Sequence, residues 1–399
     1  MMHLNRLFCS LMLFISLMML PQFTSAQSSA TTVRNIKIGI FAPLYLDSVI
    51  KNGNFQYAKK FPRFVVPALD FVQGAQIALD SMPLYNVHID AHVYDSKSQE
   101  VPVSELISSH ALDSLELMIG SVKDEEYTQL AAFALEKHIP FISATYPNDG
   151  GITANPYLII LNTTLRAHCE AIQQYLETDH KSDNIILVKK TGTQEDRING
   201  YFSQLQSADW KPAFKLQTFH SDSNFVALKS LLDSNKTNTI IGASLDEEFA
   251  GKLAVYLKNL PKKYSVKLIG MPNWETFGTF LNPSKSSLGD FPVYVTASYF
   301  NTKIDNYSKA IQDVYLSKYK GKPSDFAYKG FDAVFVFSKL LAMYGSDFTS
   351  HLNDYAYKIF TDYRFKPVYI NKKGGIPDYF ENKHVYLLKI QDGNITRSL

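Results

Sequence analysis

Small polar and aromatic side chains follow several apolar runs in this 399-residue chain. Ser143 and Thr145 follow one run, Ser244 another, and Asn273 and Trp274 a third. Hydroxyl and amide groups form directional hydrogen bonds, and an indole offers a flat apolar wall, so this set fits recognition of a small polar molecule. The predicted ligand contacts are Tyr45, Ser121, Ser143, Thr145, Thr191, Ser244, Asn273 and Trp274.

Residue types that carry catalysis are present but do not form a known motif. His168, Cys169 and Glu170 are consecutive on a predicted helix, where neighbouring side chains point in different directions. The sequence contains no Gly-x-Ser-x-Gly, phosphate-loop or His-Glu-x-x-His motif. We therefore predict a non-enzymatic protein with no catalytic residues and no cofactor, and we keep a hydrolase as the disfavoured alternative.

A metal site is the other chemistry that the sequence offers. His88 and His92 lie on one face of a predicted strand, with Asp90 between them. Residues four apart on a strand are separated by about 13 Å, which is too far to share one ion. We predict no metal site and interpret the segment as a solvated edge strand.

An acidic stretch follows the apolar run at 115–119. Gly120 and Ser121 come first, and then Asp124, Glu125 and Glu126. Three carboxylates suit the first turn of a helix because they oppose its dipole. They would repel an anionic ligand, so a cation-favouring site is the alternative interpretation.

Regularly spaced apolar runs must position these residues. Amphipathic stretches of helical length separate most of the runs, which is the pattern of βαβ units and a parallel sheet. The runs are too many for one ordinary sheet and about right for two. The fold class is therefore α/β, and the runs lie at 36–41, 87–94, 115–119, 139–143, 185–188, 214–219, 239–241, 266–269 and 293–297.

The N-terminal segment, residues 1–26, has the features of a signal peptide. An apolar run at 7–20 is shorter than the roughly 20 residues that a membrane anchor needs, and Ala26 ends a group of small residues suited to cleavage. Cleavage leaves Cys169 as the only cysteine, so no internal disulfide forms. We predict a periplasmic or secreted protein.

The charge balance argues against nucleic acid as a partner. Lys and Arg total 40 and Asp and Glu total 38, which gives a formal net charge of +2 at pH 7. A nucleic-acid-binding surface needs a strong excess of positive charge.

Two segments resemble a known family. The strand 291–300 leads through a helix into Tyr319–Pro323 (YKGKP) and a helix containing Gly330-Phe-Asp-Ala333. This order resembles type I periplasmic binding proteins of the leucine/isoleucine/valine-binding kind, in a Bacteroidota-type form. The opening strand 36–44 and the helix 71–80 are also similar to that family, so the resemblance covers nearly the whole mature chain.

The resemblance implies two doubly wound, Rossmann-like lobes joined by three crossovers, with the ligand in the interlobe cleft. The crossovers are expected near Asn162, Asn301 and Gly345. Lobe 1 is then 33–162 plus 302–345, and lobe 2 is 163–301 plus 346–399. Ligands in such sheets bind beyond the carboxyl ends of the strands, and hinge closure buries them.

We therefore expect an exported solute-binding protein that closes on an amino acid, a peptide or a cell-wall fragment, for ABC-transporter uptake or for sensing. The expected partner is a membrane permease or a cell-wall protein, and the expected state is a monomer or dimer. The alternative is a ligand-independent envelope interaction protein linked to peptidoglycan metabolism, because similar domains occur in such proteins. The acidic stretch at 124–126 and the long aromatic loop at 47–67 favour this alternative.

Overall fold

The computed structural model describes residues 35–57, 61–205, 214–219, 224–282, 288–354, 356, 358–370 and 375–398. The predicted signal peptide lies outside these ranges. Among the helices they contain, none has the length and apolar character needed to cross a membrane.

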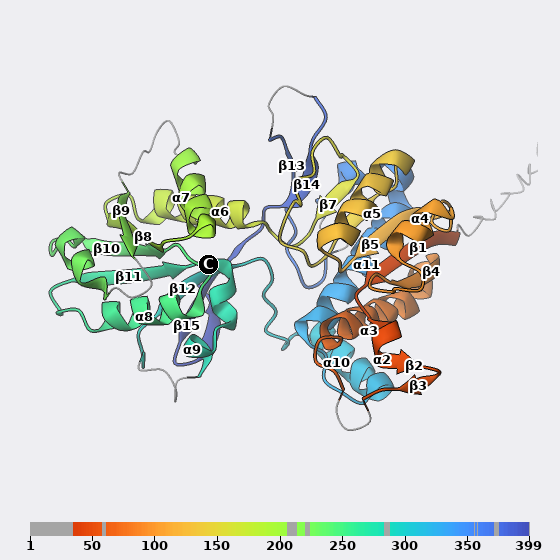
Figure 1. Cartoon of the computed structure of the whole chain (residues 1–399), viewed down its shortest axis with the longest axis horizontal. Helices are drawn as coiled ribbons and strands as arrows, with labels where there is room; N and C mark the ends of the chain where they lie inside the picture. Colours follow the sequence, from red (N-terminus) through yellow and green to blue (C-terminus); the bar gives the residue numbers. More distant parts are fainter. Residues whose placement is uncertain are drawn as a thin grey trace, which may run out of the picture. The chain divides into compact units, whose positions relative to one another are not determined.

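A seven-stranded sheet forms the centre of the first lobe (Figure 1). Its order is β13-β14-β7-β6-β5-β1-β4, and all neighbours are parallel except β13, which is antiparallel to β14. The strands are β1 (Asn35–Ala42), β4 (His88–Asp95), β5 (Leu117–Gly120), β6 (Phe141–Ser143), β7 (Leu158–Ile160), β13 (Phe365–Val368) and β14 (Tyr379–Asn382).

A second seven-stranded sheet has the order β16-β15-β12-β11-β10-β8-β9. Five strands are parallel, and β15 and β16 add an antiparallel edge next to β12. The strands are β8 (Asn184–Lys190), β9 (Lys215–Phe219), β10 (Thr237–Gly242), β11 (Ser265–Gly270), β12 (Val293–Ala297), β15 (Tyr386–Gln391) and β16 (Asn394–Arg397).

Helices connect the parallel strands and cover the sheets (Figure 1). The first lobe has α2 (Leu46–Val49), α3 (Val66–Ser81), α4 (Val103–Ser108), α5 (Asp124–Lys137), α10 (Asn306–Tyr319) and α11 (Asp325–Tyr344). The second has α6 (Leu165–Asp179), α7 (Thr193–Gln204), α8 (Glu247–Lys258) and α9 (Gly278–Leu281). Shorter elements are the 3-10 turns η1 (Met82–Tyr85), η2 (Phe225–Leu231), η3 (Pro272–Thr276) and η4 (Gly345–His351), and the hairpin β2 (Ile50–Lys51) and β3 (Asn54–Phe55).

Both faces of the first sheet are buried, which explains why its central strands are almost continuously apolar. On β5, Leu117 and Ile119 join one hydrophobic cluster, whereas Met118 between them joins the other. The outer strand β4 is half-exposed, and it lies at the sheet edge as predicted.

The third crossover lies later in the chain than predicted. Residues 365–382 pair with β7 in the first sheet, so the chain leaves this lobe after Asn382 rather than near Gly345. Asp332 of α11 accepts a hydrogen bond from the Thr361 hydroxyl (2.8 Å). This bond holds the segment before β13 on the first lobe. The sequence did not predict β13 because it contains Pro367, and proline is tolerated only in an edge strand, which is where β13 lies.

Two of the amphipathic stretches between strands form shorter or tighter helices than their length suggests. The stretch between β4 and β5 contains only the short helix α4, and the stretch between β9 and β10 forms the 3-10 turn η2.

Helices α3 and α11 touch through their backbones. A Cβ atom on Gly74 would lie 1.8 Å from the Ala327 carbonyl oxygen, and one on Gly330 would lie 2.0 Å from the Phe71 carbonyl oxygen. Each glycine therefore admits the facing helix, and α11 is held directly against the helix that follows β1.

We predict that Gly74→Ala lowers the free energy of unfolding by about 3 kcal/mol, because the methyl group forces two helix backbones apart. Gly200→Ala is the matched control. It lies inside α7 with no atom within 4 Å of the added Cβ, so helix propensity should stabilise the protein by up to about 1 kcal/mol. Urea unfolding measures both, and equal effects of the two substitutions would contradict the packing argument.

Candidate functional site

The loop after β1 is fixed by one carboxylate. Asp95, at the end of β4, accepts hydrogen bonds from the backbone N–H groups of Leu44 (2.9 Å), Tyr45 (3.1 Å) and Leu46 (2.6 Å). Tyr45 has a left-handed backbone (φ 53°) and its ring packs edge-on against Phe64 at 5.3 Å. The predicted contact Tyr45 is therefore half-buried at the carboxyl end of the first sheet.

Three further predicted residues lie together at this end of the sheet. The Ser121 and Thr145 hydroxyls are hydrogen-bonded at 3.0 Å, which joins the loops after β5 and β6. Ser143 is fully buried, and its hydroxyl has no hydrogen-bond partner in the part of the chain that the structure describes. A buried hydroxyl without a partner is uncommon and indicates either local strain or an absent bonding group.

The acidic stretch forms the first turn of α5, in agreement with the interpretation that these carboxylates stabilise the start of a helix. Glu126 forms an ion pair with Lys97 at 2.7 Å, and Asp124 lies 3.5 Å from the Lys123 ammonium. Local lysines thus offset part of the negative charge beside the loop after β5.

The predicted residues of the second lobe differ in their surroundings. Thr191 is exposed and its backbone N–H donates to the Phe219 carbonyl (3.0 Å). Ser244 is fully buried and donates to the buried carboxylate of Glu195 (2.6 Å). Asn273 donates to the Leu245 carbonyl (2.9 Å), while its own side-chain oxygen has no partner.

Trp274 belongs to the core of the second lobe and not to an open wall. Its side chain is 0% exposed, its indole N–H donates to the Ser244 carbonyl (2.8 Å), and its ring stacks on Phe280 at 5.5 Å. Gly242 and Gly270 make room for the ring, since a Cβ on either would approach it within 2.3 Å. The indole therefore offers no free surface to a ligand in this conformation.

The predicted ligand contacts do not include three polar groups that this region brings together: Glu275 in η3, Tyr299 after β12 and Lys329 on α11. Of these, only Glu275 is singled out by the resemblance, near the position where amino-acid binders place an acid. One carboxylate oxygen of Glu275 and the hydroxyl of Tyr299 are buried, and no group among the described residues meets hydrogen-bond geometry with either. The Lys329 ammonium lies 5.2 Å from the Tyr299 ring centre. Tyr299 follows the end of β12 and Glu275 lies in the turn η3 after β11, so the sequence gives a signal for both positions, whereas Lys329 lies within an apolar helix.

Burial changes the protonation of these groups. It raises the pKa of Glu275 to about 7, although the residue's own backbone N–H and the Lys329 charge act in the opposite direction. Burial also lowers the pKa of Lys329, against the influence of Asp325 and Glu275. Glu275 and Lys329 therefore lie close enough for each charge to act on the other.

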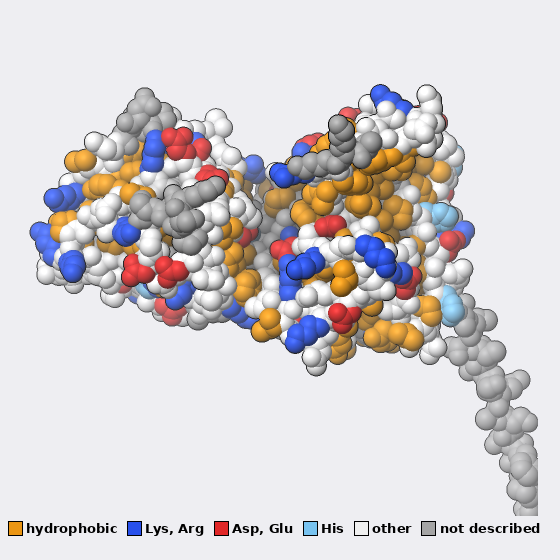
Figure 2. All heavy atoms as spheres, turned by 90° about the horizontal axis from the view of Figure 1, so that it is seen from below, with side chains coloured by type: hydrophobic (Ala, Val, Ile, Leu, Met, Phe, Trp, Pro, Cys, Tyr) orange, Lys and Arg blue, Asp and Glu red, His pale blue; other side chains and the backbone are white. Residues whose placement is uncertain are grey.

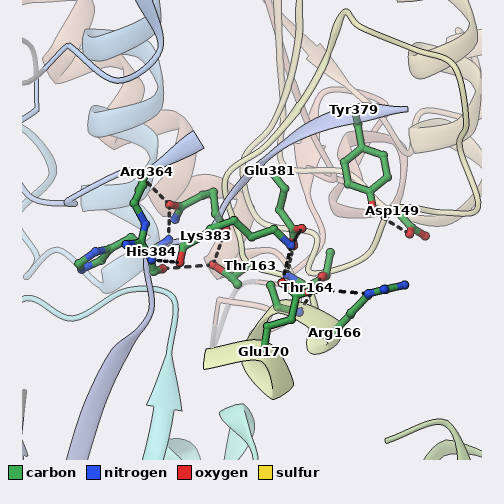
Figure 3. Close-up of polar contacts among 12 residues, drawn as sticks. Asp149, Thr163, Thr164, Arg166, Glu170, Arg364, Tyr379, Glu381, Lys383 and His384 are labelled. Atoms are coloured by element: carbon green, nitrogen blue, oxygen red, sulfur yellow. Dashed lines mark hydrogen bonds and ion pairs between the residues drawn. The ribbon is translucent and has the colours of Figure 1, made fainter. Parts of the chain in front are cut away.

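The crossovers are tied to one another by hydrogen bonds. Asn162 donates to the Thr145 carbonyl (2.7 Å) and accepts from the Ser298 hydroxyl, so it links the first crossover to the second. Thr163 donates to the carbonyls of Asn382 and His384, so it links the first crossover to the third (Figure 3).

A buried ion network reinforces this junction (Figure 3). The Glu381 carboxylate accepts from the Thr164 backbone N–H (2.8 Å) and pairs with Lys383 (2.6 Å), which also pairs with Glu170 of α6 (2.9 Å). Burial alone would lower the pKa of Lys383, but the two carboxylates outweigh it and raise the pKa above its usual value.

The residues considered for catalysis have no reactive environment. Burial lowers the pKa of His168 to about 3 and raises the pKa of the Cys169 thiol, so both groups are neutral at physiological pH. A nucleophilic cysteine needs the opposite shift. In the part of the chain that the structure describes, no three His, Cys, Asp or Glu side chains are grouped to hold a metal.

The charged side chains on one face of the molecule do not form a patch of a single sign. On the face shown in Figure 2, Lys and Arg side chains are interspersed with Asp and Glu.

No protein-family model and no curated protein matches the chain. Solved structures do match. A putative branched-chain amino acid ABC transporter from Rhodospirillum rubrum has a TM-score of 0.66 at 12% identity, covering 91% of this chain and 100% of that chain. A branched chain amino acid ABC transporter periplasmic ligand-binding protein from Burkholderia xenovorans has a TM-score of 0.60 at 12% identity, covering 91% and 94%.

An ABC transporter substrate-binding protein from Desulfitobacterium hafniense, in complex with Leu, has a TM-score of 0.55 at 15% identity and covers 91% of this chain and 100% of that chain. At these identities the likeness is one of fold. The chain has the two-lobed α/β fold of type I periplasmic binding proteins, and the predicted fold class is confirmed.

We predict that Glu275→Gln stabilises the protein in a pH-dependent way. Between the unfolded-state pKa near 4.5 and the folded-state pKa near 7, the folded protein binds more protons, so rising pH destabilises it. The penalty of the buried charge is complete above pH 7. The substitution should raise the free energy of unfolding by on the order of 1–3 kcal/mol at pH 8 and by much less at pH 4.5.

Urea unfolding at the two pH values measures this difference. Glu136→Gln, at an exposed position, is the control and should show no such dependence. An equal effect of Glu275→Gln at both pH values would contradict the buried-carboxylate argument.

Proposed function

We propose that the chain is an exported, non-enzymatic solute-binding protein. One observation carries this proposal: among the buried polar atoms that have no partner in the described part of the chain, those of Ser143, Asn273, Glu275 and Tyr299 lie at or beyond the carboxyl ends of strands. Ligands of open α/β sheets bind at these ends. A ligand that bonds these atoms would remove the penalty of leaving them unpaired.

The proposed mechanism is hinge closure on a small polar ligand. Ser121, Ser143 and Thr145 would contact it from the first lobe, and Asn273 and Glu275 from the second. Thr191 and Tyr45 would lie at the rim, while Ser244 and Trp274 would support the loops from within. The bonded crossovers at Asn162 and Thr163 supply a defined hinge.

The ligand class follows from likeness and chemistry. The structural neighbours include a substrate-binding protein in complex with Leu, and the site offers hydroxyl, amide and carboxyl groups. We propose an amino acid, a short peptide or a cell-wall fragment as the ligand, delivered to a membrane permease or to a sensing partner in the periplasm.

The test is a melting-temperature screen of the mature protein with amino acids, short peptides, sugars and muropeptides. A ligand at 100 times its Kd should stabilise the protein by about 2.7 kcal/mol. Ser143→Ala should weaken the best ligand about 5-fold, since it removes one hydrogen bond. Ser338→Ala should leave the affinity unchanged, because it deletes an equally buried, unpartnered hydroxyl within α11. The absence of a shift with every compound would contradict the proposal.

An aromatic cluster supports a second candidate function, binding to a cell-wall component. Phe55 and Phe61 stack at 5.7 Å, Tyr57 and Phe64 meet edge-on at 6.3 Å, and the phenylalanines are 42–50% exposed. Exposed rings grouped in this way are typical of an interaction surface.

Co-sedimentation with purified peptidoglycan tests this second function. The wild-type protein should sediment, and the double variant Phe55→Ser with Phe61→Ser should remain in solution without a change in melting temperature. Equal sedimentation of both proteins would exclude the cluster as the binding surface.

A further inference from the structure

Lys329 is an unusual residue for its position on α11. The helix is almost entirely buried from Ala327 to Leu341, yet Lys329 interrupts this apolar run with a cation. No hydrogen bond or ion pair to its ammonium occurs among the residues that the structure describes. Its side chain is half-buried, with the Tyr299 and Phe326 ring centres at 5.2 and 5.7 Å.

The nearest acidic groups do not neutralise Lys329. Asp325, one turn earlier on α11, is engaged with Lys303 at 2.7 Å. Glu275 comes from the second lobe and forms no ion pair with Lys329 within 4.0 Å, although each charge influences the other. The ammonium therefore lies beside two aromatic rings and has no hydrogen-bond or ion-pair partner among the described residues, which is costly for a partly buried cation unless a bonding partner arrives.

A second buried group points to the nature of that partner. Among the described residues no group meets hydrogen-bond geometry with the Tyr299 hydroxyl. Burial raises its pKa, although the nearby Asn301 side chain acts in the opposite direction, so the hydroxyl keeps its proton at neutral pH. An ammonium and a phenolic hydroxyl on neighbouring side chains are both hydrogen-bond donors, and a carboxylate accepts from two donors at once.

We propose that Lys329, together with Tyr299, is the anion-binding pole of the ligand site and that the ligand carries a carboxylate that bonds the Lys329 ammonium. Glu275 is the opposite pole and accepts from a donor on the same ligand. This inference rests on the proposed solute-binding function and specifies its ligand as a small dipolar carboxylate. Neutral sugars are excluded, because they would leave both charges unpaired.

This assignment also accounts for the acidic start of α5. The N-terminal turn of α5 carries Asp124, Glu125 and Glu126, which do not favour an anion beside the loop after β5. If the ligand carboxylate binds Lys329 on α11, it does not have to lie beside the start of α5. The three acidic residues there then do not conflict with an anionic ligand group.

The test uses matched probes that differ only in the carboxylate: L-leucine against L-leucinamide, and L-glutamate against L-glutamine. Calorimetric titration and melting curves are measured on the mature wild-type protein and on Lys329→Met and Lys329→Arg. At least one carboxylate probe should bind the wild-type protein at least 10-fold more tightly than its amide. Lys329→Met should lose at least 10-fold in affinity for that probe, and Lys329→Arg should retain affinity within about 3-fold.

A direct readout follows the ammonium itself. After reductive ¹³C-methylation, the NMR titration of Lys329 should show its pKa rising when the carboxylate probe binds. An unchanged melting temperature of Lys329→Met without ligand shows that the variant is folded; if it is not folded, Lys329→Arg and the NMR titration decide.

Three results would overturn the assignment: a probe that binds wild-type protein and Lys329→Met equally, an amide that binds as tightly as its acid, or a Lys329 titration unaffected by a bound carboxylate. Binding of sugars alone would overturn it while leaving the solute-binding function intact. Binding of no compound at all would overturn both.

Discussion

The structure depends on how three chain segments pass between two separately folded sheets. Each passage exposes backbone groups that no sheet ladder can satisfy, and these groups need other partners when they are buried. Asn382 supplies several of them: its side chain donates to the Leu161 carbonyl and accepts from the N–H groups of Arg364 and His384. Thr163 returns a bond to the Asn382 carbonyl. Without this junction, neither sheet would hold its strand ends in a defined relation to the crossovers.

The junction and the candidate ligand site differ in how their buried polar side chains are hydrogen-bonded. At the junction the buried carboxylate of Glu381 has a backbone donor and a lysine partner, and the side chains of Asn382 and Thr163 are bonded. Beyond the strand ends, one carboxylate oxygen of Glu275 and the hydroxyl of Tyr299 have no partner of hydrogen-bond geometry among the described residues. Buried polar atoms without a partner are uncommon in folded proteins, and among the described residues the Nε2 of His384 at the junction is also one of them. The proposed ligand site therefore rests on the grouping of such atoms beyond the strand ends.

The sequence was most informative where the hydrophobic effect alone determines structure. Continuous apolar runs such as 185–188 predicted central parallel strands, and the resemblance identified the fold. The short strands β13 and β14 could not be predicted, because Pro367 disfavours a strand and Tyr379–Asn382 carries polar side chains that bond the crossovers. Because these two strands were not predicted, the third crossover was expected near Gly345, too early in the chain.

For the site, position along the chain was predictable but side-chain orientation was not. Residues after strands were correctly expected near the sheet ends, yet the spacing could not show that Trp274 turns into the core while Glu275, its neighbour, keeps an unpaired oxygen. Two adjacent residues in a 3-10 turn point in different directions, and glycines far away in sequence, Gly242 and Gly270, decide which one is enclosed. Lys329 could not be predicted as a site residue for a related reason, because only the tertiary fold brings α11 to the strand ends.

The late position of four strands has a consequence for biogenesis. β13 and β14 complete the first sheet, and β15 and β16 complete the second, so both sheets receive their last strands from residues 365–397. A chain in which residues 365–397 have not yet folded therefore has two incomplete sheets with open edges, and open edges are prone to pair with other chains. The last segment of the described chain thus completes two cores at once, and neither sheet has all its strands before that segment is in place.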